Sequence, residues 1–425
     1  MNKEIKDRVI SLIDRERLEQ LAMDLVNIPS PTGQEGAVSD FILGWLKGHG
    51  FKAFQQEVEE GRPNVVGVLP GDGSGCSLTF NSHMDTSFTG TDADYLTLGE
   101  VSDACKARAY RDGGRICGLG INNDKGPLAA FLTAALAVRQ SGVALKGDLV
   151  LAGVVGEIGR APVGSHRGPG SRGKGVGTRF LLTHGVVTDY ALVAEPSSFT
   201  MTWALPGAVF LRLTTRGRPA YTPFTRRDEK GVSHENAIVR MLPVLEAFED
   251  WGRQYQEARR YKFSGGEIIP KVNIGAIEGG MPIKPNYSPA ICHAYVDIRT
   301  PPGANPLEIK REVEGVLSAG GLAAEVDMFL SQKGYEGVGV EPLVEAVKDS
   351  HLFVFGDLPK PISAEHTSMW NDVNIYHEYG IPSIKYGPPT ITYGFKREEC
   401  LNTDDLLRAA QVYALAALEI CGRAR

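Results

Sequence analysis

The chain has 425 residues, of which 23% are charged and 42% hydrophobic, and this ordinary usage excludes a disordered or fibrous protein. The 45 Lys and Arg against 51 Asp and Glu give a net charge of −6, which excludes the basic surface typical of nucleic-acid binding. No apolar run reaches the roughly 18 residues of a membrane span, and the charged N-terminus is no secretory signal. The 6 cysteines form neither a CxxC pair nor a disulfide framework, so we expect a cytoplasmic globular protein of two or three domains.

Helices and strands alternate through the first part of the chain. Apolar residues from Val9 to Leu25 recur at helical spacing, which predicts one amphipathic helix ending before Pro29. Buried strands are then predicted at 77–82, 147–157 and 189–197, with a helix at 126–142 between the first two. This alternation predicts a largely parallel sheet flanked by helices, an α/β fold whose ligands bind beyond the carboxyl ends of the strands.

The order of elements changes after Trp203. Strand, helix, two strands, helix and strand follow one another, predicted at 207–217, 235–251, 271–280, 292–300, 305–321 and 322–332. This β-α-β-β-α-β order is that of a ferredoxin-like α+β unit. We therefore predict that 203–332 is an insert, and that 1–202 and 333–425 together form the catalytic, metal-binding domain.

Polar side chains that could bind a metal ion follow the predicted strands. They are His83 in NSHMDT, Asn123 and Asp124 in GINNDKG, and Glu195 in VAEPS. One imidazole with oxygen donors suits a divalent transition metal ion, and Asp85, two residues after His83, could orient its ring. A single histidine is more often a structural residue than a ligand. The joint occurrence of these segments at strand ends is what predicts a metal site.

These segments resemble the aminoacylase/carboxypeptidase metallopeptidases, a family that includes peptidase T, aminoacylase and succinyl-diaminopimelate desuccinylase. The matching stretches are SHMDT, GINNDKG, EIG, AEP, ENAI, VDIR and GIPSIKYGP. The resemblance covers essentially the whole chain. It implies a mixed, largely parallel, zinc-exopeptidase-like sheet with an inserted lid/dimerisation domain, and a homodimer or larger homo-oligomer. Family members hold two zinc-like ions bridged by one carboxylate, with a glutamate base beside them.

The chain departs from this family at the metal-binding positions. Asn123 stands at the position of the bridging aspartate, and a neutral amide cannot offset the repulsion of two dications. Gly156 aligns with the base and Glu157 with a ligand of the second ion, so we expect Glu157 to act as acid and base. The resemblance thus implies one ion per subunit, manganese or zinc with cobalt or nickel as further options, held by His83, Asn123 and Glu195. Two alternatives stay open: Asp124 is the ligand instead of Asn123, or Glu157 is only structural.

Aromatic residues take the places of two functional histidines of the family. Tyr221 aligns with the lid histidine, and only Tyr393 or Phe395 is offered where the last metal-binding histidine should follow the GPP turn. Arg299 of VDIR is retained and is a candidate for an anionic group of the substrate. We expect these residues to contact a small aromatic or amino-acid-like carboxylate, and we expect no membrane or nucleic-acid partner.

An ordinary dipeptidase fits these departures poorly. Loss of a single oxyanion donor typically costs about 10² to 10³ in rate, and here a base, a histidine and an ion are missing together. One ion can still supply hydroxide at neutral pH, which suits a ring whose nitro group accepts the negative charge. The family that this chain resembles has a member that catalyses such a reaction, the conversion of 5-nitroanthranilate to 5-nitrosalicylate and ammonia. We therefore predict a metal-dependent aminohydrolase that acts in nitroaromatic degradation. We expect Glu157 and Asp85 to be its catalytic residues. The alternatives are a di- or tripeptidase or N-acyl amino acid amidohydrolase, with Glu157 as its base, and a degenerate binding protein.

Overall fold

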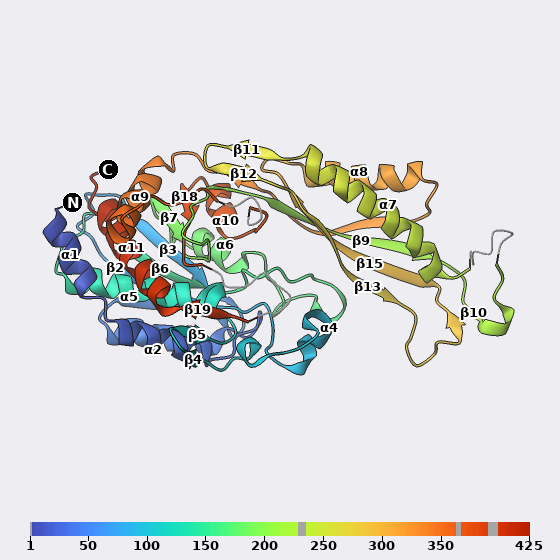
Figure 1. Cartoon of the computed structure of the whole chain (residues 1–425), viewed down its shortest axis with the longest axis horizontal. Coiled ribbons are helices and arrows are strands. Elements are labelled where there is room, and N and C mark those ends of the chain that lie inside the picture. The colour runs from blue at the N-terminus through green and yellow to red at the C-terminus, as the bar shows by residue number, and fades with distance from the viewer. Residues whose placement is uncertain (1, 228–234, 363–366, 390–397) are drawn as a thin grey trace. The chain divides into compact units, whose positions relative to one another are not determined.

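The chain divides into two units in the computed structural model, which describes residues 2–227, 235–362, 367–389 and 398–425 (Figure 1). The α/β unit runs to Trp203 and resumes at Gly337–Ile362 and Asn371–Arg425. The insert unit comprises Ala204–Glu336 and the described residues 367–370. The short segment 367–370 thus groups with the insert, although the sequence analysis assigned it to the last catalytic segment.

A six-stranded sheet forms the centre of the α/β unit, in the order β1-β2-β6-β3-β7-β18. Its strands are β1 (Lys52–Glu59), β2 (Arg62–Leu69), β3 (Leu78–His83), β6 (Leu149–Val154), β7 (Tyr190–Val193) and β18 (Ser383–Lys385). β6, β3, β7 and β18 pair in parallel, whereas β1 and β2 pair antiparallel at one edge. The predicted mixed, largely parallel sheet is confirmed.

Helices cover both faces of this sheet. One face carries the larger core and packs against α1 (Lys3–Ser11), α2 (Arg15–Val26), α3 (Gly36–Gly48), α5 (Gly126–Gln140), α9 (Glu341–Phe355) and α11 (Thr403–Cys421). The other face packs against α6 (Val176–Thr183) and α10 (Val373–Glu378). β6 shows why both faces are apolar: Leu149 and Leu151 join the larger core, while Val150 and Val154 join the smaller one.

The N-terminal segment contains two helices where the sequence analysis predicted one. α1 ends at Ser11 and α2 begins at Arg15, and Asp14 between them caps α2 by accepting from the backbone N–H of Arg17 at 3.1 Å. The apolar spacing continues across the break because both helices bury residues in the same core. Periodicity alone therefore missed the stop signal.

A small sheet joins two distant parts of the α/β unit. It has the order β19-β5-β4, formed by β4 (Tyr110–Asp112), β5 (Arg115–Cys117) and β19 (Cys400–Asn402), and the short helix α4 (Tyr95–Leu98) precedes it. Cys117 and Cys400 lie opposite each other and form a disulfide across 283 residues of sequence. The sequence analysis expected no disulfide framework and did not foresee this pair, because pairing depends on the strands that meet in space and not on spacing. The cysteines therefore no longer support a cytoplasmic location.

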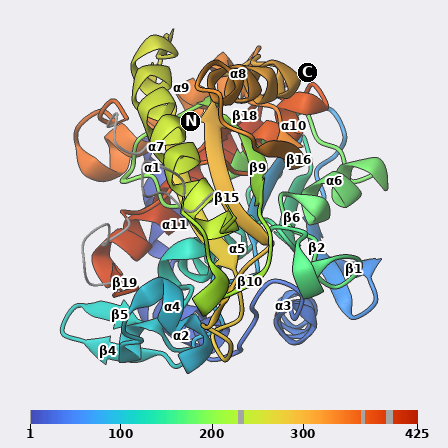
Figure 2. The same cartoon turned by 90° about the vertical axis from the view of Figure 1, so that its right-hand side faces the viewer.

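The insert unit is a four-stranded antiparallel sheet in the order β13-β15-β9-β16, covered on one face by α7 and α8 (Figures 1 and 2). Its main elements are β9 (Gly207–Arg216), α7 (Ala237–Ala258), β13 (Val272–Gly279), β15 (Ile291–Thr300), α8 (Pro306–Ala319) and β16 (Glu325–Gln332). Short strands at its margins are β8 (Ala204–Leu205), β10 (Ala220–Tyr221), β11 (Tyr261–Phe263), β12 (Gly266–Ile268), β14 (Tyr287–Ser288) and β17 (Tyr335–Glu336). This order is the predicted ferredoxin-like topology.

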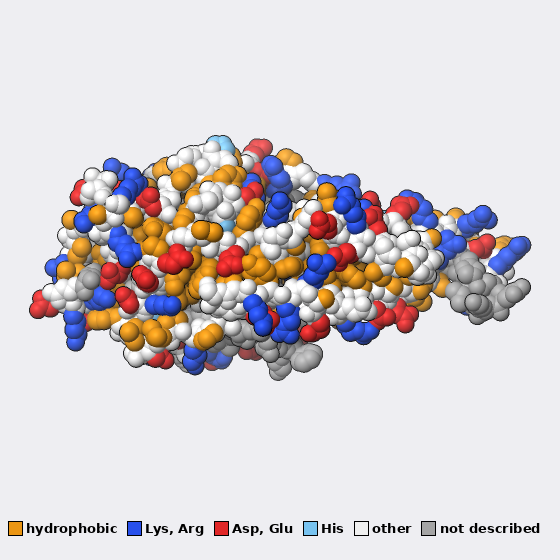
Figure 3. All heavy atoms as spheres, turned by 90° about the horizontal axis from the view of Figure 1, so that it is seen from above, with side chains coloured by type: hydrophobic (Ala, Val, Ile, Leu, Met, Phe, Trp, Pro, Cys, Tyr) orange, Lys and Arg blue, Asp and Glu red, His pale blue; other side chains and the backbone are white. Residues whose placement is uncertain are grey.

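The surface carries charges of both signs. Acidic and basic side chains are interspersed over the face shown in Figure 3, in keeping with the net charge of −6. None of the helices in the described ranges combines the length and apolarity needed to cross a membrane.

Candidate metal centre

The parallel register of the main sheet brings the predicted ligands to one edge and one face. Asn81 of β3 pairs with Val193 of β7, and His83 and Glu195 each follow two residues later. Because side chains alternate along a strand, both project on the face of Asn81, opposite Phe80 in the larger core. Asn81 donates to Thr178 of α6 and to the Tyr376 hydroxyl of α10, at 3.0 and 3.1 Å, which identifies that face.

Three buried side chains form a cluster that could hold a metal ion. Each of His83, Asp124 and Glu195 offers one ligand atom, and these atoms lie within 4.8 Å of one another. The Nε2 atom of His83 is 3.3 Å from Oδ1 of Asn123 and 3.5 Å from Oδ2 of Asp124. Both residues considered for the third ligand therefore face the imidazole.

The environment of Asp124 fits a cation. Both of its carboxylate oxygens are buried and have no hydrogen-bond partner among the described residues. Burial, followed by the charges of Glu195 and Glu157, raises the pKa of Asp124 well above its usual value. Buried carboxylates without protein donors are costly unless a positive charge compensates them. This donor set therefore suits a divalent ion.

Asp85 positions both the imidazole and the turn that carries Glu157. The backbone carbonyl of Asp85 lies 2.8 Å from Nδ1 of His83, whereas its carboxylate Oδ1 is 3.6 Å away. The carboxylate instead accepts from the backbone N–H groups of Glu157 and Ile158 at 3.1 and 3.2 Å, and from the Thr32 hydroxyl at 2.8 Å. Through these contacts Asp85 orients the ring by its backbone and the Glu157 turn by its side chain.

Glu157 is the acid that faces the metal-binding imidazole from outside the cluster. Its Oε2 lies 3.8 Å from Nε2 of His83. The preceding residue, Gly156, has φ of +63°, and a Cβ there would lie 2.6 Å from a Val176 methyl and 2.8 Å from the Arg172 carbonyl oxygen. The position that aligns with the family's base thus has no room for a side chain in this backbone conformation.

Further buried charges surround the cluster, and the sequence analysis missed them. Burial, then the charges of Glu195 and Asp372, raises the pKa of Glu157 well above its usual value. Asp372 is 1% exposed, accepts from the Thr178 hydroxyl at 2.5 Å, and has a pKa that burial raises to about 7. Lys174 and Lys385 are also buried. No motif pointed to Asp372 or Lys174, and Lys385 lies in the matching stretch GIPSIKYGP but was given no role there. Their segments reach the site only through tertiary packing.

The predicted substrate-contacting residues lie in other surroundings. Tyr221 belongs to the insert unit, is 41% exposed, and has its ring centroid 5.5 Å from that of Tyr287. Arg299 is also in the insert unit and donates to Asp297 at 2.8 and 3.1 Å, so it has a structural ion pair there. Tyr393 and Phe395 lie outside the described residues.

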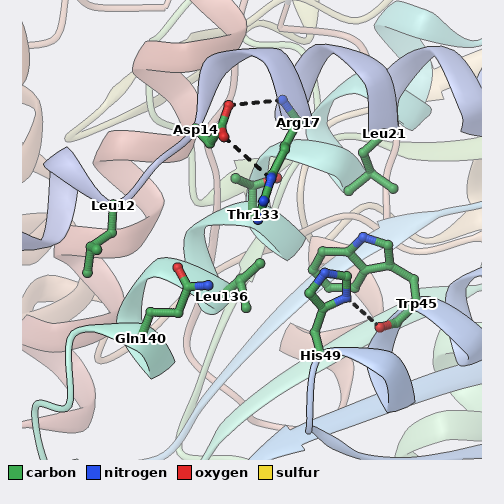
Figure 4. Close-up of a pocket in the computed structure, with 9 residues that line it drawn as sticks. All are labelled: Leu12, Asp14, Arg17, Leu21, Trp45, His49, Thr133, Leu136 and Gln140. Carbon is green, nitrogen blue, oxygen red and sulfur yellow. Dashed lines mark hydrogen bonds and ion pairs between the residues drawn. The ribbon is translucent and has the colours of Figure 1, made fainter.

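A separate small pocket of about 50 Å³ lies among α2, α3 and α5 (Figure 4). Leu21, Trp45 and Leu136 line it, and Arg17 pairs with Asp14 at its edge at 3.4 Å. It shares no residue with the metal-binding cluster.

Comparison with known proteins shows similarity along most of the chain. The model of "Peptidase family M20/M25/M40" matches residues 79–419. An N-formyl-4-amino-5-aminomethyl-2-methylpyrimidine deformylase of Bacillus subtilis is 24% identical, over 96% of this chain and 96% of its own. A succinyl-diaminopimelate desuccinylase of Cereibacter sphaeroides is 24% identical, over 94% and 96%.

Solved structures share the fold. Human carnosine dipeptidase 1 superposes with a TM-score of 0.72 at 17% identity, over 98% of this chain and 99% of its own. A tripeptidase from Staphylococcus aureus gives a TM-score of 0.67 at 19% identity, over 96% and 99%. The chain therefore has the same fold as these solved peptidase structures.

Proposed function

The chain belongs to peptidase family M20/M25/M40 and is a hydrolase of C–N bonds, and from this premise we propose that it is a single-metal aminohydrolase. The proposed reaction replaces an aromatic amine by a hydroxyl group. The observation that carries the proposal is Glu157, which faces His83 beside a Gly156 that leaves no room for the family's usual base.

One divalent ion per subunit, manganese or zinc with cobalt or nickel as further options, is the proposed cofactor. His83 and Glu195 would hold it with an oxygen donor from residues 123–124, and the unpartnered oxygens of Asp124 favour that carboxylate. A second full ligand set lacks support in the sequence, because no histidine follows residue 377. When bound, the ion would lower the pKa of a water toward about 7 and so supply hydroxide.

Glu157 moves the protons in this proposal. It accepts a proton from the attacking water while the new C–O bond forms at the ring carbon that bears the amine. The displaced electron pair moves into the nitro group and returns as the C–N bond breaks. Glu157 then gives its proton to the departing amine, which leaves as ammonia. Burial raises the pKa of the Glu157 carboxyl well above its usual value, so this group holds a proton more readily than an exposed glutamate does, which suits both transfers.

The substrate we propose is 5-nitroanthranilate, and the product is 5-nitrosalicylate. In the family, the two histidines that this chain lacks would help to stabilise the negative charge of the intermediate. A nitro group within the substrate accepts that charge itself, so strong oxyanion donors are not needed. We also propose that the substrate carries a carboxylate, that the protein is a homo-oligomer, and that its role is in nitroaromatic degradation.

Amide hydrolysis is the second candidate. It is favoured by two relatives, a deformylase and a desuccinylase, that match more than nine-tenths of the chain. In that reaction Glu157 would transfer the same protons, but the negative charge would develop on a carbonyl oxygen and need donors of its own.

A substrate panel separates these functions. The protein, loaded with manganese or zinc, is incubated with 5-nitroanthranilate, with anthranilate as the matched control without a nitro group, and with N-formyl, N-succinyl and dipeptide substrates. We expect ammonia release and an absorbance change with 5-nitroanthranilate and none with anthranilate. Turnover of only the acylated or peptide substrates would establish the second candidate, and turnover of nothing would indicate a binding protein.

A further inference from the structure

The metal-binding cluster and the adjacent Glu157 together hold more negative charge than one dication neutralises. Asp124, Glu157 and Glu195 are all buried around a single imidazole. Metal binding requires ionised ligands, and in that ionised state the three carboxylates carry three negative charges, of which a dication offsets two. A further positive charge is needed close by, since unpaired buried charge is costly.

Lys385 lies on the correct face to supply that charge. It pairs with Val193 in the parallel register of β18 and β7, so its side chain shares the face of Val193 and Glu195. The neighbouring Ile384 joins the core on the opposite face. Two residues later, Gly387 packs against the backbone of Glu195, where a Cβ would lie 2.3 Å from the carbonyl oxygen. Lys385 is 1% exposed and is thus enclosed beside the cluster.

The charge of Lys385 acts on all three carboxylates. It opposes the rise in pKa that burial causes at Glu195 and at Asp124. Burial in turn lowers the pKa of Lys385, and Glu195, Asp124 and Glu157 oppose that change. The buried Lys125 provides a contrast, because its Nζ donates to the Ile28 carbonyl at 2.6 Å. The acid that opposes the fall in the pKa of Lys125 is Glu399, which is not one of the three carboxylates.

We propose that Lys385 is a built-in counter-charge that takes the place of a second cation and limits this centre to one metal ion. With Lys385 and one dication the three carboxylates are balanced, whereas a second dication would leave a buried excess of two positive charges. Lys174 and the buried Asp85 act on Glu157 with opposite charges and leave this sum unchanged. Burial raises the pKa of Asp372 to about 7, so this residue adds less than a full negative charge near neutral pH.

The inference deepens the proposed function, since it rests on a single-ion site. It is a statement about a positioning residue, because Lys385 acts on the carboxylates that hold the ion. Its test is therefore a count of ions and not a rate.

The experiment compares the full-length protein with Lys385→Met, Lys385→Gln and Lys385→Arg. Each is saturated with manganese or zinc, freed of excess ion, and assayed for ions per chain by mass spectrometry and for affinity by calorimetry. We expect one ion for the wild type and for Lys385→Arg. We expect the neutral variants to take up more than one ion per chain, or to bind the first at least tenfold more tightly.

Lys125→Met is the matched control, a buried lysine whose loss should leave the ion count at one. Circular dichroism confirms folding, and Lys385→Gln serves if the methionine variant does not fold. Two ions in the wild type, or unchanged count and affinity in the neutral variants, would overturn the inference. A single ion without turnover of 5-nitroanthranilate would instead refute the proposed function and leave the role of Lys385 standing.

Discussion

Glu157 is the residue on which the proposed chemistry depends most directly. It faces His83 at 3.8 Å, and its turn is held by two backbone hydrogen bonds to Asp85. We expect Glu157→Gln to lower kcat by about 10² to 10⁴, because the amide keeps the shape but cannot transfer the proton. The KM and the metal content should stay near wild type in steady-state kinetics and metal analysis.

The exposed Glu60 offers a control, since Glu60→Gln removes a carboxylate outside the site and should leave kcat unchanged. Loss of the ion in Glu157→Gln would show that this residue is a ligand. An unchanged rate would assign it a structural role.

The neighbouring pair Asn123 and Asp124 decides the ligand set. Both lie close to Nε2 of His83, but only Asp124 has buried carboxylate oxygens without a partner. We expect Asp124→Asn to weaken manganese or zinc binding at least about tenfold, which is 1.4 kcal/mol, as measured by calorimetry. Asn123→Ala should weaken it less. The reverse order would establish the amide as the ligand, as the sequence analysis predicted.

At the scale of elements, the disulfide between β5 and β19 connects segments that border the site. Cys117 precedes the stretch that contains Asn123 and Asp124, and Cys400 precedes α11. A covalent link across a long loop restricts the unfolded chain. We therefore expect Cys400→Ser to lower the free energy of unfolding by about 2 to 5 kcal/mol in denaturant titrations without reductant.

Cys76→Ser, which changes a free cysteine, is the control for that measurement. Treatment of the wild type with a reductant should reproduce the effect of Cys400→Ser. Equal stability of the wild type with and without reductant would show that the bond contributes nothing to folding.

At the scale of the whole molecule, the buried acids make the stability of the metal-free protein depend on pH. Burial raises the pKa of Asp372 from 3.8 to about 7, so the folded state binds this proton more tightly than the unfolded state. Asp372 therefore makes its full contribution to the free energy of unfolding below about pH 4. Between about pH 4 and pH 7 that free energy falls, by at most about 1.4 kcal/mol per pH unit.

Asp372→Asn should remove this dependence. Urea unfolding of the metal-free proteins at pH 5, 6 and 7 is expected to show the wild type losing stability relative to the variant as the pH rises. A constant difference between the two proteins would show that Asp372 stays charged throughout this range.

Local patterns were sufficient for the architecture. The alternation of strands and helices predicted the mixed sheet, and the β-α-β-β-α-β order predicted the ferredoxin-like insert, because each element buries its own periodic face. The same signal failed between α1 and α2, where two helices share one core and only the cap at Asp14 marks the break.

The sequence by itself determined which residues meet at the strand ends, since parallel strands bring His83 and Glu195 to a common edge. Only the tertiary structure decided what surrounds them. Asp372, Lys385 and the pairing of Cys117 with Cys400 join elements far apart in the chain. No periodicity records such contacts, because they depend on how the sheet, its helices and the returning C-terminal segment pack together.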